Sequence, residues 1–205
     1  MKKIYKLFSF LIFTYTYSQC NTITDLDPEN SNVLGGVEGI YYKDLNNVLN
    51  NFEGTYLYNN GSTFFKMKLL KKIMSKNGTY NCEDMLIGGA EFITDGLLIW
   101  NTIPLLNTFF DDGFKYKLKA NSIYTGDDRG CDECGINEKW LAGHITDPLT
   151  DQSCEIFIRK IIHNGQEAIK ISFHIDITRR FYKEGTTPPP PMNIPYEDMI
   201  LIKQP

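Results

Sequence analysis

The strongest constraint on the fold is a stretch of alternating side chains near the C-terminal end of the chain. From Ile169 to Ile177 an apolar residue occupies every second position, and polar residues stand between them. A period of two places all the apolar side chains on one face of a β-strand. An upstream run, Glu155–Ile162, is joined to this stretch through Asn164-Gly165, a pair that tolerates the positive φ angles of a tight turn. The sequence therefore predicts a hairpin over Glu155–Ile177 with one buried face and one solvated face.

Most of the chain before and after this hairpin has the same strand-like character. Thr55–Tyr58 and Thr63–Ile73 flank the turn composition Asn59–Ser62 and predict a second hairpin. Further short strands are expected at Met85–Ile87, Glu91–Thr94, Leu97–Ile103, Tyr116–Tyr124, Lys139–Ile145 and Met199–Lys203, and Pro188–Pro191 predicts an extended surface connection. The fold class is therefore mainly β, an antiparallel meander that closes fully or partly into a lipocalin-like barrel, because open edges invite aggregation.

One short helix is expected before the first strand. Leu45, Val48, Leu49 and Phe52 recur at the spacing of one helix face, and Asp44 can cap the first turn.

The first residues have the pattern of a secretory signal peptide. Three lysines precede the apolar run Leu7–Phe13, which is too short to span a bilayer. We expect residues 1–19 to be the signal peptide, residues 20–40 a flexible tether, and residues 41–205 a single antiparallel β domain. The protein is then exported to the periplasm, the outer membrane or the extracellular space.

Cys20 leaves the attachment of the exported protein open. Bacterial lipoproteins are cut directly before a cysteine that then carries the lipid, and a lipid on Cys20 would be the only link to the membrane. Tyr17 and Gln19 depart from the residues usual before such a cysteine. Three fates are therefore open: lipidation at Cys20, ordinary cleavage around Ser18 and Gln19, and an uncut leader.

The charge balance argues against nucleic-acid binding. The chain has 21 basic and 25 acidic residues and a net charge of −4. Outside the first residues, Lys and Arg cluster in no more than pairs, whereas a phosphate backbone requires a basic face.

The motif Cys131-Asp132-Glu133-Cys134 is the most specific chemical feature. It lies in a Gly- and Asp-rich loop between two strands, whereas a redox pair opens a helix. Zinc would need two further ligands from Cys82, Cys154 or the scattered histidines His144, His163 and His174. In an exported chain the four cysteines after Cys20 favour disulfides. Of the three possible pairings we favour Cys131–Cys134 with Cys82–Cys154.

No catalytic constellation accompanies these cysteines. The sequence has no Gly-x-Ser-x-Gly nucleophile turn and no phosphate-binding loop. We expect a non-enzymatic binding or structural module without a cofactor, whose partner is a small apolar ligand inside the barrel or another envelope protein. A filled barrel interior would favour the second partner. The alternative is a metal-dependent hydrolase or other enzyme that uses Cys131, Cys134 and a histidine.

Two resemblances support this reading. Gly54-Thr55-Tyr56 resembles the opening of lipocalin-type barrels, in which Gly-x-Trp starts the first strand and the aromatic ring fills the barrel floor. More widely, the chain resembles an uncharacterised family of small exported envelope proteins of Gram-negative bacteria, a domain of unknown function. The matching segments are KDLNN (43–47), FEGTY (52–56), NEK (137–139), DPLTD (147–151), NGQEAIKI (164–171), GTTPPPP (185–191) and ILIKQ (200–204). This resemblance implies export and no particular activity.

Overall fold

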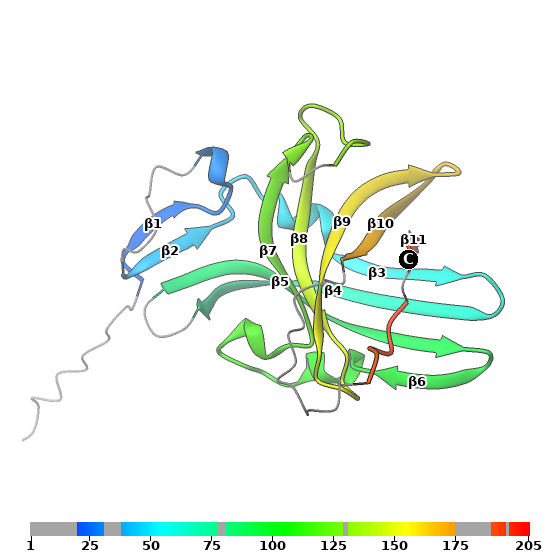
Figure 1. The fold of residues 1–205 in the computed structure, drawn as a ribbon. Helices are drawn as coiled ribbons and strands as arrows, with labels where there is room; N and C mark the ends of the chain where they lie inside the picture. Colours follow the sequence, from blue (N-terminus) through cyan, green and yellow to red (C-terminus); the bar gives the residue numbers. More distant parts are fainter. Residues whose placement is uncertain (1–19, 31–37, 78–80, 129–130, 175–189, 196) are drawn as a thin grey trace, which may run out of the picture.

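A closed barrel of eight antiparallel strands forms the centre of the molecule (Figure 1). The computed structural model describes residues 20–30, 38–77, 81–128, 131–174, 190–195 and 197–205. The barrel strands are β3 (Gly54–Asn59), β4 (Thr63–Asn77), β5 (Asn81–Thr94), β7 (Leu118–Thr125), β8 (Lys139–Thr146), β9 (Ser153–His163), β10 (Gln166–His174) and β11 (Met199–Lys203). Each pairs with the next in chain order, β11 pairs with β3, and β7 closes the ring against β5. The predicted fold class is confirmed.

The predicted C-terminal hairpin is present as β9 and β10. Gln166 lies opposite His163, and the turn residues Asn164 and Gly165 have φ angles of 49° and 78°. Ile169 and Ile171 are fully buried, as the alternation predicts. Residues 175–177 of the predicted strand lie outside the described residues.

Strand β5 is continuous where the sequence suggested two short strands separated by glycines. A Cβ atom on Gly88 would lie 2.6 Å from the Leu118 side chain, and one on Gly89 would lie 2.6 Å from Cα of Ile103. The two glycines therefore admit close neighbours instead of ending the strand. Strand β6 (Leu97–Asn101) pairs with the end of β5, and the 3-10 turns η3 (Ile103–Asn107) and η4 (Gly113–Lys115) follow it.

The barrel interior is filled by side chains. Its fully buried members come from every barrel strand, among them Tyr56, Phe65, Leu86, Leu118, Leu141, Ile158, Ile169 and Leu201. At one end Tyr56 donates its hydroxyl to the Phe52 carbonyl at 3.0 Å. This ring fills the floor as the lipocalin-like opening predicts. At the other end Met192 and Ile194 join the core, and the Trp100 indole donates to the Asn193 carbonyl at 2.5 Å.

The predicted short helix is a single 3-10 turn, η2 (Leu49–Phe52). Asp44 accepts from the backbone N–H groups of Val48 and Leu49, so it does act as a cap. The positive φ of Asn47 (54°) prevents one continuous helix, and Leu45 points into solvent. No helix among the described residues is long and apolar enough to cross a membrane.

The segment predicted as a flexible tether is fixed against the barrel over its described residues. It contains β1 (Thr22–Asp25), the 3-10 turn η1 (Pro28–Asn30) and the start of β2 (Ile40–Lys43). β1 pairs in parallel with β2, which pairs in parallel with β5 beside the barrel (Figure 1). Leu26 enters the main core. The polar composition of this segment predicted a linker, because two strands as short as β1 and β2 show no periodic pattern of apolar residues in the sequence.

Candidate functional site

A pocket of about 240 Å³ lies on the outer wall of the barrel, beneath the loop that joins β7 to β8. Its lining comes from that loop, from the outward positions of β8, β9 and β10, and from the approach to β11. The lining residues are Cys131, Asp132, Glu133, Trp140, Phe157, Arg159, Lys170, Ser172, His174 and Asp198. The pocket therefore uses the faces of the strands that point away from the barrel core.

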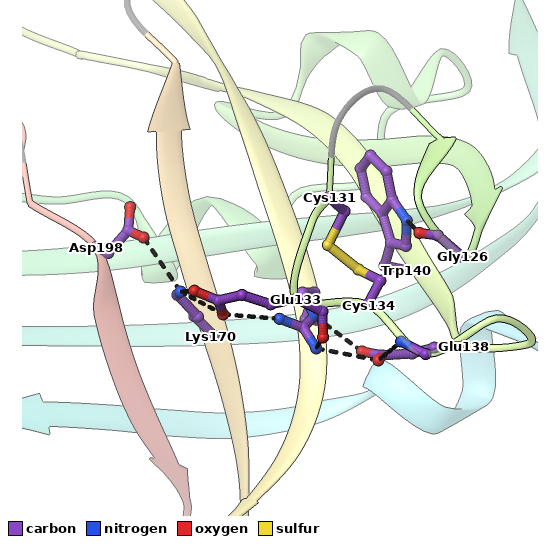
Figure 2. A network of polar contacts seen from close by, with 10 residues as sticks. Gly126, Cys131, Glu133, Cys134, Glu138, Trp140, Lys170 and Asp198 are labelled. Atoms are coloured by element: carbon purple, nitrogen blue, oxygen red, sulfur yellow. Dashed lines mark hydrogen bonds and ion pairs between the residues drawn. A yellow bond between two sulfur atoms is a disulfide. The ribbon is translucent and has the colours of Figure 1, made fainter.

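A chain of ion pairs runs across the strands beside this pocket (Figure 2). Arg159 donates to Glu138 at 2.8 Å and to Glu133 at 3.0 Å. Lys170 continues the chain, with its Nζ 2.8 Å from Glu133 and 3.4 Å from Asp198. Glu133 bridges the two basic residues and so fastens the loop to β9 and β10.

The ion pairs keep these groups charged at neutral pH. A hydrogen bond from Lys170 lowers the pKa of Glu133, and one from Arg159 lowers the pKa of Glu138. The same bonds raise the pKa of both basic residues. In these four side chains the direction of each pKa shift favours the charged form, so they act as an electrostatic link between the loop and the strands.

A row of stacked rings crosses the same wall. Tyr124 stacks on Trp140 with ring centroids 4.7 Å apart, Trp140 lies 4.9 Å from Phe157, and Phe157 lies 4.0 Å from His174. The Trp140 indole donates to the carbonyl of Gly126 at 3.1 Å, and the loop buries its ring. Phe157 is half-buried and His174 is exposed, so the open end of the row forms one side of the pocket.

The structure contains two disulfides. Cys131 is bonded to Cys134, the favoured pairing for this motif, and the bond closes the loop over the pocket (Figure 2). The other favoured pairing was wrong, because Cys82 is bonded to Cys20. Through the strand register Cys154 lies level with Gly88. That is six residues beyond Cys82 on β5, roughly 20 Å along the strand.

Cys154 is the remaining free cysteine. It is buried in the barrel core, and burial raises the pKa of its thiol to about 12. A nucleophile needs the opposite environment, in which the thiolate is favoured and exposed.

The histidines are not brought together. His174 lies in the pocket, whereas His144 is on β8 and His163 ends β9. Desolvation, followed by the charge of Lys119, lowers the pKa of His144. Among the described residues no group of three or more His, Cys, Asp and Glu side chains could hold a metal ion. With Cys131 and Cys134 joined to each other, neither sulfur is a free thiolate in this structure.

The charges that line the pocket favour a positively charged group. Its lining has three carboxylates (Asp132, Glu133 and Asp198) against two basic side chains (Arg159 and Lys170). Among the described residues the Asp132 side chain has neither a hydrogen bond nor an ion pair. A positive group in the pocket would meet an unpaired carboxylate and the face of an aromatic ring.

Sequence reasoning did not show that the charged members of this site meet one another. Lys170, Ser172 and His174 were recognised as the solvated face of their strand, and this placement is correct. Arg159 and Glu133 gave no local signal, because they are 26 residues apart and meet only when the loop folds over β9.

No curated protein and no solved structure matches this chain. A family model does match, over residues 1–204, and its description is "Family of unknown function (DUF6705)". The match spans the barrel, the disulfide loop and the pocket, so the chain belongs to this family of unknown function.

Proposed function

We propose that this protein is an exported, non-enzymatic binding module that takes a basic side chain of a partner envelope protein in the pocket on its outer wall. The observation that carries the proposal is the pairing of an aromatic side of the pocket with an excess of carboxylate. Phe157 and His174 form that side, and Asp132 adds a negative charge that no described residue neutralises.

The packing of the barrel favours a binding site on the outer wall over one in the interior. Lipocalin-type ligand binding needs an open mouth and a roomy apolar cavity, generally of about 300–1,000 Å³. Here Met192 and Ile194 are buried in the main core at one end, and Leu49 and Phe52 are buried in it at the other. Between the ends, inward residues such as Phe65 have no exposed surface.

The dimensions of the pocket suit one long side chain. Its volume of about 240 Å³ is below that of typical drug-sized sites. A lysine or arginine can lay its methylene stem on an aromatic ring and bring its charge to a carboxylate at the rim. The ion pairs of Arg159 and Lys170 hold the pocket walls in place before binding, and such preorganisation lowers the entropic cost of association.

The test is a titration of isotope-labelled protein followed by nuclear magnetic resonance. The probe is Nα-acetyl-lysine methylamide, and its uncharged counterpart is Nα-acetyl-norleucine methylamide. The lysine probe should shift the Trp140 indole signal and the backbone amides near Phe157, with an affinity in the millimolar range. Asp132→Asn should weaken binding by about two- to fivefold, the range of an exposed ion pair.

The matched control is Asp127→Asn, an equal charge change in the same loop at a residue outside the pocket lining. It should leave the affinity unchanged. If the norleucine probe binds equally well, or if Asp132→Asn leaves the affinity for the lysine probe unchanged, the pocket is not a site for a basic side chain.

A further inference from the structure

We infer that Cys20 is a disulfide partner of Cys82 and is not the attachment site of a lipid. The sequence leaves both fates open, because a cysteine follows the signal peptide but Tyr17 and Gln19 depart from the lipoprotein pattern. In the structure the Cys20–Cys82 bond spans 62 residues, and both cysteines are buried against Tyr41.

The two fates exclude each other because they use the same atom. Lipidation forms a thioether on Sγ of Cys20, whereas the disulfide joins that Sγ to Sγ of Cys82. In forming the disulfide, the two thiols lose two protons and two electrons to a protein disulfide of an exported thiol oxidase, which becomes a dithiol. A thioether sulfur has no proton to lose and cannot enter this exchange.

The surroundings of Cys20 fit a structural disulfide better than a lipid anchor. Strand β1 begins at Thr22, two residues after the cysteine, and the N–H of Asn21 donates to the carbonyl of Gly39 at 2.9 Å. Cys20 itself is only 6% exposed and is buried with Tyr41 and Cys82, whereas a lipid-bearing cysteine must project from the protein surface into the bilayer.

The following residues hold the segment along the barrel. Lys139 on β8 forms ion pairs with Asp27 at 2.8 Å and with Glu29 at 2.6 Å. Beyond Cys20, therefore, the described chain offers no free spacer between an anchor and the folded domain. A lipoprotein generally needs such a spacer for its domain to stand clear of the membrane.

The disulfide predicts how the protein behaves after export. Once the signal peptide is removed, Cys20 gives it no hold on the membrane, and the protein remains in the aqueous phase of its compartment. This inference does not depend on the proposed ligand, because the pocket residues lie on the loop before β8, on β8–β10 and just before β11.

The experiment expresses the full chain in a bacterium that has both a lipoprotein-processing pathway and an oxidising periplasm. Cells are grown with an alkyne-bearing fatty acid, and the protein is analysed by detergent phase partition and by non-reducing peptide mapping. We expect no fatty acid on the protein, recovery in the aqueous phase and a peptide pair linked through Cys20 and Cys82. A thioether-modified Cys20 peptide, or partition into the detergent phase, would overturn the inference.

Two matched variants distinguish a structural disulfide from a lipid attachment site. If Cys20 is a disulfide partner, Cys20→Ser and Cys82→Ser each remove the bond and leave one additional free thiol. Both variants then lower the melting temperature by a similar amount and leave phase partition unchanged. For an anchor, Cys20→Ser alone would move the protein from the detergent phase to the aqueous phase, and Cys82→Ser would not. The second pattern contradicts the inference even if both variants fold poorly, because lipid incorporation can be measured on unfolded protein.

Discussion

The two faces of the β9–β10 hairpin differ in what they hold. Inward residues Ile156, Ile158, Ile169 and Ile171 are fully buried in one apolar core. Outward residues of the same two strands carry an aromatic ring, two cations and a histidine, and they line the pocket. One pattern of alternation thus encodes the fold on one face and a candidate site on the other, and the faces should respond differently to substitution.

The largest expected effect is on the inward face. Ile169→Ala should lower the free energy of unfolding by about 2–5 kcal/mol, because it removes buried apolar surface and leaves a cavity. Ile162→Ala is the control, since Ile162 belongs to the same hairpin but is 67% exposed. It should change the free energy by less than about 0.5 kcal/mol. Urea denaturation measures both, and similar losses would contradict the burial of Ile169 in the barrel core.

The inward face of the hairpin could be predicted from the sequence, and the arrangement of the site on its outward face could not. The alternation of β10 predicted the hairpin and its buried face, because a period of two is local information. The disulfide loop could not be placed on the outer wall, since Glu133 and Lys170 meet across 37 residues. The partner of Cys82 was missed for a related reason. The parallel pairing of β2 with β5 brings Cys82 close to Cys20, which is 62 residues away in the sequence.

A smaller effect is expected from the loop on the outward face. Replacing Cys131 and Cys134 together by serine should lower the free energy of unfolding by about 2 kcal/mol, because the bond closes a very short loop. The Trp140 indole N–H, which donates to Gly126, should then exchange faster with solvent. Hydrogen exchange measures this change. If Trp140 stays protected in the variant, the disulfide is not what holds the loop over the wall.

A still smaller effect is expected from the ion pairs. Arg159→Met should lower the free energy of unfolding by about 1 kcal/mol at neutral pH, since the ion pairs are partly exposed. The pKa of Glu138 is lowered in the folded state, so its contribution is present above the ordinary glutamate pKa of 4.5 and is lost as the pH falls through the lower folded-state value. Denaturation as a function of pH should therefore show a steeper acid loss for the wild type. Parallel curves would mean that Arg159 does not set this dependence.

The smallest expected effect is on Cys154, whose thiol should not react at all in the folded protein. Its side chain points into the core, and burial raises the pKa of the thiol to about 12. At about pH 8 almost no thiolate forms, and an aromatic disulfide reagent has no path to the sulfur. We expect one thiol to react in high urea and none before unfolding, with Cys154→Ser as the blank. Rapid reaction of the native protein would show that the barrel interior admits small molecules, and an apolar ligand inside the barrel would then again compete with the pocket on the outer wall.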